Sequence, residues 1–188
     1  MRITTIRHGE TDWNVEKRAQ GSKDIALNQT GLNQAERLAE RLAKEPCDII
    51  YSSDLLRAKK TAEIINSRHH VELITSTHLR ESGFGEFEGQ VLSDPKVSAK
   101  FSAFMDKRAP AYFTQVHRYL EEILRVGHEN IFIVGHHGTV RAIICYLLKI
   151  PVEHRGVYII GNTAIHTFEM TNDGEFAMVL ENDTAHLN

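Results

Sequence analysis

The sequence predicts a three-layer α/β protein, in which helices cover both faces of a mostly parallel central sheet. Two observations favour this class. Short segments rich in β-branched residues alternate along the chain with longer segments whose apolar residues recur every three or four positions. The helical segments are also long enough to join neighbouring parallel strands.

The expected strands are short and apolar. The segment 131–134 is the clearest buried strand, and Asn172, Asp173 and Gly174 predict a turn between the last two strands. The complete set of predicted strands is 2–6, 48–51, 71–74, 131–134, 157–160, 164–170 and 176–180.

The expected helices carry one apolar stripe each. Thr30 and Asp54 stand where N-caps are expected, and Pro151 prevents the last helix from continuing. The predicted helices are 30–44, 55–68, 113–125 and 139–149. Residues 90–112 lack a regular pattern, so we expect a short lid-like excursion there, within a single domain over residues 1–188.

Charge and composition exclude several classes of partner. The chain has 22 basic and 25 acidic residues, a net charge of −3, and this balance argues against a strong non-specific grip on nucleic acid or on an anionic membrane. Cys47 and Cys145 are the only cysteines and are expected to be reduced. Residues 1–7 are too short and too polar for a signal peptide, and no apolar run reaches the roughly 20 residues of a membrane span. The expected compartment is the cytosol.

Histidines and arginines follow three of the predicted strands, at the point where each strand ends. Arg7 and His8 come after the first strand, and Arg57 comes shortly after the second. His136 and His137 follow the clearest buried strand. Ligands of open α/β sheets bind outside the carboxyl ends of the strands, and forked arginines with imidazoles are typical of a phosphate site there.

Small residues accompany these side chains. Gly9, Gly135 and Gly138 are expected to let a ligand approach the backbone closely. Gly138 also stands at the start of a helix, whose free N–H groups favour an anion.

His8 is the predicted nucleophile, because no Cys, Ser or Lys stands beside it in a suitable setting. Attack of its neutral imidazole on phosphorus gives a phosphohistidine, which water then hydrolyses. Arg7, Arg57 and His136 are expected to stabilise the charge on the phosphoryl oxygens, and Glu81 is the predicted acid for the leaving oxygen. No His, Cys or Asp cluster has metal-ligand spacing, so we expect catalysis without a metal or another cofactor.

Five motifs carry a family resemblance. They are RHGETDWN at 7–14, LNQTGLNQA at 27–35, SSDLLRAKKTA at 52–62, LRESGFGEFEG at 79–89 and VGHHGTVR at 134–141. In this order they resemble the histidine phosphatase superfamily, in its phosphoglycerate mutase-like branch. Asn162 lies where that family often has a late asparagine.

The resemblance implies the fold stated above, a small phosphorylated metabolite as substrate, and no metal. The site residues that it implies are His8, Glu81 and His136 as catalytic groups, Arg7, Asn14 and Arg57 on the phosphate, and Gln20 and Gly21 on the substrate side.

The chain departs from the family pattern at two places. His137 stands where the family usually has glycine, so it either lines the pocket mouth or has a structural role. The segment before Phe113 is short and lacks the Gly-Glu-Ser opening of many relatives. A short segment leaves a more open site, which favours hydrolysis of the phosphohistidine over its return to a product.

Three functions stay open from the sequence. A phosphomonoesterase is the leading one, a phosphoglycerate mutase is the second, and a binding protein without turnover is the third. The intact set of His8, Arg57, Glu81 and His136 argues against the third. Glu86 and Glu10 are the next candidates for the acid if Glu81 does not serve.

Overall fold

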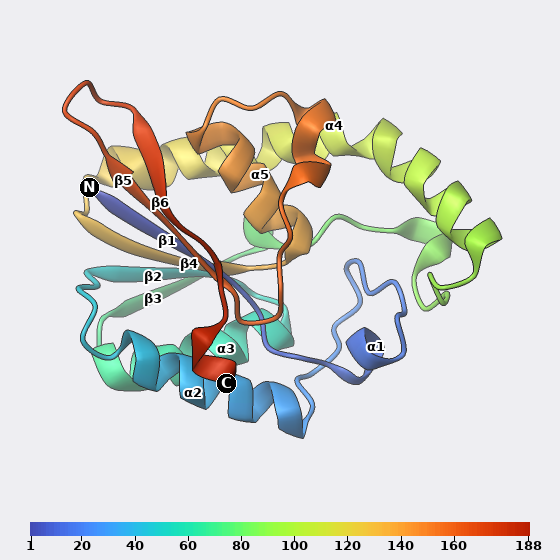
Figure 1. Cartoon of the computed structure of the whole chain (residues 1–188), viewed down its shortest axis with the longest axis horizontal. Coiled ribbons are helices and arrows are strands. Elements are labelled where there is room, and N and C mark those ends of the chain that lie inside the picture. The colour runs from blue at the N-terminus through green and yellow to red at the C-terminus, as the bar shows by residue number, and fades with distance from the viewer.

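A six-stranded sheet runs through the centre of the protein in the computed structural model, which describes residues 1–188 (Figure 1). The strand order is β3-β2-β4-β1-β5-β6. The strands are β1 (Arg2–Arg7), β2 (Ile49–Ser53), β3 (Glu72–Ser76), β4 (Asn130–Gly135), β5 (Ile165–Met170) and β6 (Phe176–Asp183). The first four pair in parallel, whereas β5 is antiparallel to both β1 and β6. The prediction of a mostly parallel sheet is confirmed.

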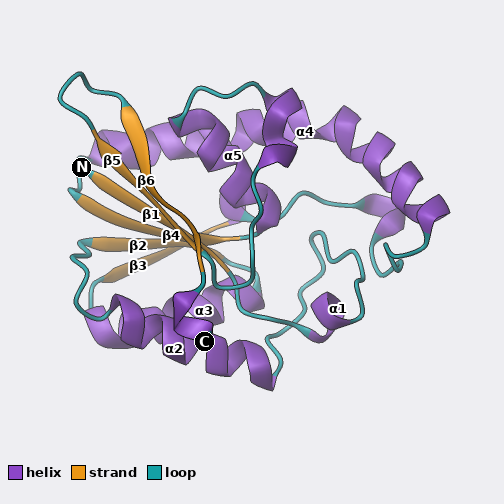
Figure 2. Cartoon of the chain, in the orientation of Figure 1, coloured by secondary structure: helices purple, strands orange, loops and turns teal.

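Helices cover both faces of this sheet. In Figures 1 and 2, α2 (Gln29–Leu42) and α3 (Leu56–His69) lie below it, and α4 (Pro95–Val126) and α5 (His137–Leu147) lie above it. The four-residue helix α1 (Asp12–Val15) lies beyond the carboxyl end of β1. The three-layer architecture follows from the sequence, because each helix presents one apolar stripe and each central strand is apolar on both faces.

The core is divided between the two faces of the sheet by the alternation of side chains along β4. Ile131 and Ile133 point to the side that α4 and α5 cover. Phe132 and Val134 point to the side that α2 and α3 cover. All four are at most 2% exposed, so β4 is buried on both faces, as its continuous apolar run predicts.

The carboxyl ends of β1, β2 and β4 lie side by side. Arg7 is in register with Gly135, and Val134 is in register with Ser52. Whatever follows these three strands is therefore delivered to one edge of the sheet, where the loops of Figure 2 reach α1 and the beginning of α4. The site is expected at this edge.

The predicted strand 157–160 is wrong. The chain there leaves a 3₁₀ turn, Val152–Val157, and passes the edge of the sheet without pairing. A strand has no place at this position because β5 already occupies the free edge of β1. Side chains satisfy the backbone instead: Arg7 Nη1 donates to Ile160 O at 2.7 Å, and Arg141 donates to Tyr158 O.

The irregular excursion predicted for 90–112 is also wrong over most of its length. Asp94 caps a helix that begins at Pro95, passes through Pro110 and ends at Val126. Pro110 lies on the exposed side of α4, where the carbonyl that lacks its usual donor can bind water. Phe101 and Phe104 in the first half of α4 pack on the rings of Phe84 and Phe87. This contact is made with another loop, so no periodicity within the segment predicts it.

Smaller details of the predictions also differ. Asn28, not Thr30, caps α2 by accepting from Gly31 N–H. The turn at Asn172–Gly174 is present, with Gly174 at φ 82°. Cys47 and Cys145 are free thiols. None of the helices is both long enough and apolar enough to cross a bilayer.

Candidate active site

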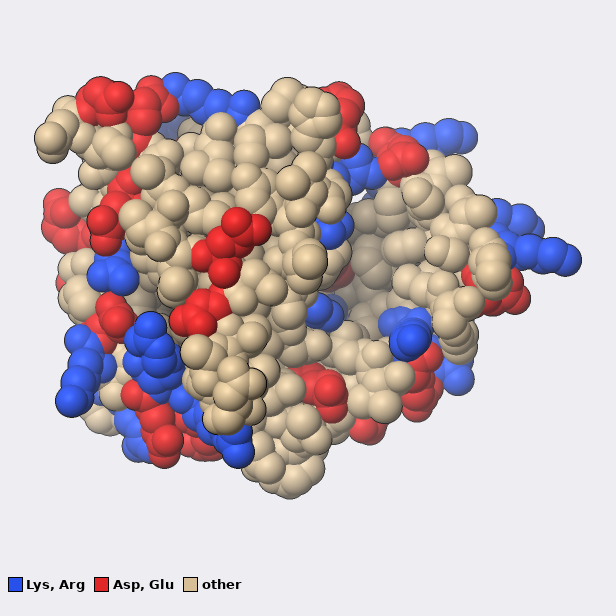
Figure 3. Space-filling model, in the orientation of Figure 1, with Lys and Arg blue, Asp and Glu red and all other residues tan.

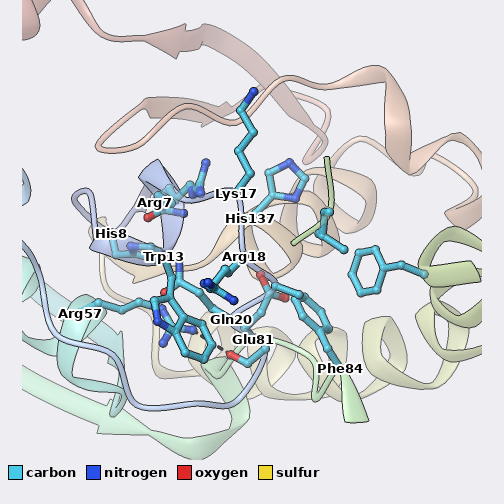
Figure 4. Close-up of a pocket in the computed structure, with 15 residues that line it drawn as sticks. Arg7, His8, Trp13, Lys17, Arg18, Gln20, Arg57, Glu81, Phe84 and His137 are labelled. Carbon is cyan, nitrogen blue, oxygen red and sulfur yellow. Dashed lines mark hydrogen bonds between the residues drawn. The ribbon is translucent and has the colours of Figure 1, made fainter. Parts of the chain in front are cut away.

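A cavity of about 310 Å³ opens at the carboxyl ends of β1, β2 and β4. Most of the predicted site residues line it; they are Arg7, His8, Asn14, Gln20, Gly21, Arg57, Glu81 and His137. In Figure 4, His8, Arg7 and Arg57 lie on one side of the cavity, and Glu81 and Phe84 lie on the other. His136 is the one predicted residue that is not on the wall.

His8 presents one nitrogen to the cavity. Its Nδ1 lies 2.7 Å from Gly9 O, and because a carbonyl oxygen can only accept, Nδ1 carries the proton. Nε2 therefore keeps its lone pair. Because His8 is only 3% exposed, this lone pair can be reached from the cavity alone. This is the state that a nucleophilic imidazole requires.

A turn from the far end of the chain holds the backbone of His8. Asn162 Nδ2 donates to His8 O at 3.0 Å, and Thr163 N–H donates to Arg7 O at 3.1 Å. Thr163 has φ 54°, a strained value for a β-branched residue, and it is fully buried. His186, near the end of the chain, lies 2.9 Å from Thr163 Oγ1 and supports the turn. Strain at this position is consistent with a precisely held nucleophile.

A buried arginine, Arg57, and a half-buried one, Arg7, supply positive charge. Arg7 Nε is buried without a hydrogen-bond partner, although Nη1 donates to Ile160 O. Arg57 donates through Nη1 to Lys23 O at 2.6 Å and through Nη2 to Gly21 O at 2.8 Å. These bonds use one proton of each nitrogen, so further N–H groups remain for an anion. Burial lowers the pKa of Arg7 and of Arg57 to about 10, and both stay charged at neutral pH.

His136 lies beneath the cavity. Its ring centroid is 5.2 Å from that of His8, and the ring is fully buried. Arg57 Nε donates to His136 Nδ1 at 3.2 Å, so Nε2 carries the proton that faces Ser53 Oγ at 2.9 Å. Both ring nitrogens therefore have protein partners, and in this arrangement His136 orients Arg57. Direct contact of His136 with phosphate stays a prediction.

Glu81 is held by backbone donors on the opposite wall. Oε1 accepts from Ser82 N–H at 2.9 Å, and Oε2 accepts from Gly138 N–H at 3.0 Å. The N–H group of Gly138 at the start of α5 thus binds the Glu81 carboxylate, and its contact with a phosphate stays a prediction. A Cβ at position 138 would overlap the Glu81 carboxylate, so any other residue there would displace the carboxylate from this position.

An ion pair fixes the segment that carries Glu81. Arg80 Nε and Nη2 donate to the two oxygens of Asp54, at 2.7 and 2.6 Å. The sequence predicts that Asp54 caps α3, and this prediction is wrong because Asp54 pairs with Arg80. Leu55 takes the N-cap position, and Asp24 accepts from Leu56 N–H. This forked pair ties the end of β2 to the acid motif.

The other two predicted glycines have protein atoms where a Cβ would lie. A Cβ at Gly9 would lie 2.5 Å from Gly31 O, at the beginning of α2. A Cβ at Gly135 would press on Thr139 at 3.0 Å. These glycines allow close packing behind the site. A glycine in the sequence can indicate either such packing or close approach of a ligand, and residue type alone does not distinguish the two.

Polar groups without protein partners also face the cavity. The amide oxygen of Asn14 accepts from Thr11 N–H and Oγ1, both at 3.1 Å, so its Nδ2 is left for the cavity. Gln20 Oε1 is buried without a partner. His137 makes no hydrogen bond through its ring and lies on the wall, so it belongs to the pocket.

Several wall residues are not predicted from the sequence. They are Trp13, Lys17, Arg18, Phe84 and Phe101. Arg18 pairs with Glu16 and donates to Gly89 O, whereas the side chain of Lys17 extends away from the cluster (Figure 4). Phe101 is missed because it lies on the first half of α4. No group of three or more His, Cys, Asp or Glu side chains is placed to hold a metal ion.

The buried histidines make stability depend on pH. Burial, and after it the charge of Arg57, lowers the pKa of His8 and of His136 well below the usual value, and burial lowers the pKa of His137 to about 3. Below pH 6.5 the unfolded chain binds protons at these positions and the folded protein does not. The free energy of unfolding is therefore expected to decrease as the pH is lowered below 6.5, by about 1.4 kcal/mol per pH unit for each histidine.

Urea unfolding at pH 7.5, 6.5 and 5.5 measures this dependence. The variant His137→Gly is the matched control, because it removes one of these protons and should reduce the slope by about one proton; the buried His166, whose pKa burial lowers to about 4, contributes to the slope in both proteins. Equal unfolding free energies at pH 7.5 and 5.5 would contradict the prediction.

The comparisons with known proteins agree with this geometry. The sequence profile of the histidine phosphatase superfamily (branch 1) matches residues 3–184. Phosphoglycerate mutase-like protein 4 of Arabidopsis thaliana is 33% identical over 98% of this chain and 86% of its own length. Phosphoserine phosphatase 1 of Hydrogenobacter thermophilus is 26% identical over 100% of this chain and 94% of its own length.

Solved structures match over nearly the whole chain. The phosphoserine phosphatase of Entamoeba histolytica, solved in complex with 3-phosphoglyceric acid, superposes with a TM-score of 0.88 at 28% identity. The match covers 100% of this chain and 99% of that one. The mycobacterial glucosyl-3-phosphoglycerate phosphatase superposes with a TM-score of 0.86 at 25% identity, over 96% and 98% of the two chains. The chain belongs to the histidine phosphatase superfamily, and its relatives include phosphoserine phosphatases and phosphoglycerate mutase-like proteins.

Proposed function

We propose that this protein hydrolyses small phosphomonoesters in two steps, through a phosphohistidine formed on His8. One observation carries the proposal: Gly9 O holds the proton of His8 on Nδ1, which leaves the Nε2 lone pair at a cavity wall shared with Arg7 and Arg57. A nucleophile with fixed positive charge beside it is what transfer of a phosphoryl dianion needs.

In the first step, His8 Nε2 forms a bond to phosphorus as the bond from phosphorus to the ester oxygen breaks. The electron pair of the broken bond stays on that oxygen, and protonated Glu81 donates the proton that neutralises it. The Glu81 carboxyl lies across the cavity from His8, so nucleophile and acid can act on opposite sides of the phosphorus (Figure 4). The phosphate dianion favours the protonated carboxyl by like-charge repulsion.

In the second step, water takes the place of the alcohol. The Glu81 carboxylate accepts a proton from the water, whose oxygen bonds to phosphorus while the bond from His8 breaks. The products are inorganic phosphate and the starting enzyme. Glu81 thus acts as acid and then as base, at one position of the cavity.

The transferring group is held by charge-assisted hydrogen bonds. The free N–H groups of the Arg7 and Arg57 guanidinium groups are the strongest donors, and Asn14 Nδ2 adds a neutral one. His136 keeps Arg57 in place through Nδ1. Because these cations neutralise the negative charge on the phosphoryl oxygens, we propose that turnover needs no metal ion.

The second candidate function is that of a phosphoglycerate mutase. The sequence favours hydrolysis partly through a short, open segment before Phe113, but α4 fills that segment and places Phe101 on the cavity wall. A covered site is a feature of mutases. Hydrolysis stays the better supported function because the full-length relatives include phosphoserine phosphatases.

Product analysis distinguishes the two functions. Purified protein receives phosphoserine in one reaction, and 3-phosphoglycerate with a trace of 2,3-bisphosphoglycerate in another, both with and without a chelator. We expect release of inorganic phosphate at the same rate in chelator. Rapid formation of 2-phosphoglycerate with negligible free phosphate would establish the mutase, and loss of activity in chelator that Mg²⁺ restores would end the metal-independent mechanism.

A further inference from the structure

A second cavity, of about 330 Å³, reaches Glu81 from a different side than the catalytic cavity does. Residues 80–83 form one of its walls, and the outer side of α4 between Lys107 and Gln115 forms the other. We name it the rear pocket. Glu81 is the only residue that lines both the rear pocket and the catalytic cavity, so the steps proposed for turnover leave the rear pocket unused.

The α4 wall of the rear pocket carries two cations without an acidic partner. Lys107 and Arg108 are exposed, and neither makes an ion pair or a side-chain hydrogen bond within the protein. The guanidinium of Arg108 lies over the ring of Phe104, with Cζ 5.4 Å from the ring centroid. Figure 3 shows Lys and Arg atoms that project over the first half of α4, on the right of the view. This part of the surface is therefore basic, although the whole chain has a net charge of −3.

The opposite wall supplies a buried hydroxyl. Ser82 is 3% exposed, and its Oγ is buried without a hydrogen-bond partner. Buried polar atoms are rarely left unpaired, so this hydroxyl calls for a ligand or a water molecule. The neighbouring Gly83 leaves space in front of α4, since a Cβ there would lie 3.9 Å from Arg108 Nη2. The Arg108 cation and the segment that carries the hydroxyl thus border the same space.

These groups match a small dianion. Two unpaired cations balance two negative charges, and a tetrahedral oxyanion such as phosphate or sulfate can accept hydrogen bonds from a guanidinium, an ammonium and a hydroxyl at the same time. The Glu81 carboxylate on the wall is already occupied, because its two oxygens accept from the N–H groups of Ser82 and Gly138.

Ser82 connects the rear pocket to the catalytic acid. Its N–H donates to Glu81 Oε1 at 2.9 Å, while the residue itself lines the rear pocket. An anion in the pocket repels the negative carboxylate and so favours the protonated form of Glu81. Linkage requires the reciprocal effect, in which protonation of Glu81 strengthens binding of the anion. The protonated form is the one that donates a proton to the leaving oxygen.

We propose that the rear pocket is an effector site for a small dianionic oxyanion, such as the inorganic phosphate that the reaction releases, and that the bound anion promotes the acid form of Glu81. Binding of the anion does not depend on what the protein catalyses, whereas its effect on turnover rests on the proposed phosphatase function. Lys107, Arg108 and the Ser82 hydroxyl are the groups that bind the anion.

Sulfate is the probe for binding, followed through the backbone amide signals of the protein by NMR. We expect the Ser82 and Gly83 signals to shift as sulfate is added. The double variant Lys107→Gln, Arg108→Gln should lose these shifts and keep the response of Gly21, which lines the catalytic cavity. Ser82→Ala should weaken binding at the rear pocket by about tenfold, the effect of one hydrogen bond to a charged group.

The matched control is the double variant Lys96→Gln, Lys100→Gln. It removes the same charge from the same helix, at exposed residues that line neither cavity. The wild-type response of Ser82 and Gly83 should persist in this control.

A ratio of rates measures the effect on turnover. Sulfate also competes with substrates for the catalytic cavity, but this competition lowers the apparent kcat/KM of every substrate by the same factor. The ratio of kcat/KM for phosphoserine to that for p-nitrophenyl phosphate therefore responds only to the effector. At pH 7.5, with ionic strength held constant by NaCl, we expect saturating sulfate to raise this ratio by about fivefold, the lower end of coupling between sites. The reason is that the serine oxygen needs the proton of Glu81 and p-nitrophenolate needs little help.

Each failure has its own signature. Ser82 and Gly83 signals that ignore sulfate, that respond equally in the Lys107, Arg108 double variant, or that report unchanged affinity in Ser82→Ala would overturn the rear site. Sulfate bound at the rear pocket with an unchanged ratio of rates would overturn its effector role. Absence of hydrolysis of both substrates by the wild-type protein would overturn the phosphatase function and leave the binding result standing.

Discussion

Replacement of His8 by alanine is expected to lower kcat by roughly three to six orders of magnitude, as loss of a nucleophile does in enzymes whose catalytic groups act as a unit. The side chain presents a nucleophilic lone pair to the cavity wall that Arg7 and Arg57 share, and its Nδ1–H bond to Gly9 O orients that lone pair. Water at the same place has neither the orientation nor the basicity of the imidazole.

Two measurements check this expectation. Steady-state phosphate release gives kcat, and rapid quenching of the wild-type protein with labelled substrate should trap a protein-bound phosphate that is labile in acid and stable in base. His8→Ala should carry no such label. His78→Ala is the matched control, because it removes an exposed histidine outside the cavity and should leave both measurements unchanged. Normal turnover by His8→Ala would refute the nucleophile.

Replacement of Glu81 by glutamine is expected to slow substrates with poor leaving groups far more than substrates with good ones. General acid catalysis contributes about 10²- to 10⁴-fold, and an alkoxide needs all of that help while p-nitrophenolate needs little. Glutamine can still accept a hydrogen bond from Gly138 N–H, so the substitution removes the proton and retains the contact. Phosphoserine hydrolysis should therefore fall by two or more orders of magnitude, and p-nitrophenyl phosphate hydrolysis by much less.

The ratio of the two rates is the measurement, over a series of leaving groups if possible. Glu10→Gln and Glu86→Gln are the controls, since they replace the next candidates for the acid. Glu10 accepts from Asn28 Nδ2 and lies outside the cavity wall, so Glu10→Gln should slow all substrates alike or not at all. An equal loss for all leaving groups in Glu81→Gln would move the acid role to another residue.

The sequence predicts the sheet well, and it also predicts the site residues that directly follow the strands. β1, β2 and β4 are short segments rich in β-branched or apolar residues, and their carboxyl ends lie side by side in any parallel sheet that pairs them. Arg7 and His8 follow one of these ends, and His136 follows another. Strand direction alone therefore predicts that these residues lie close together, without knowledge of any side-chain contact.

What the sequence does not predict depends on contacts between distant segments. Helix α4 continues through Pro110 because Phe101 and Phe104 pack on Phe84 and Phe87, and a local pattern cannot weigh that gain against the cost of an internal proline.

The same holds for single side chains. Residue type at position 136 predicts an imidazole near phosphate, but only the folded chain brings Arg57 Nε and Ser53 Oγ to its two nitrogens. Gly138 predicts a free helix N-terminus, but only the folded chain brings the Glu81 carboxylate to it, from 57 residues away. Arg141 and Arg155 line one cavity only because η3 (Val152–Val157) packs on α5. The sequence by itself thus determines which groups the strands carry to the edge of the sheet, while long-range packing and hydrogen bonding determine which of their atoms remain free to act.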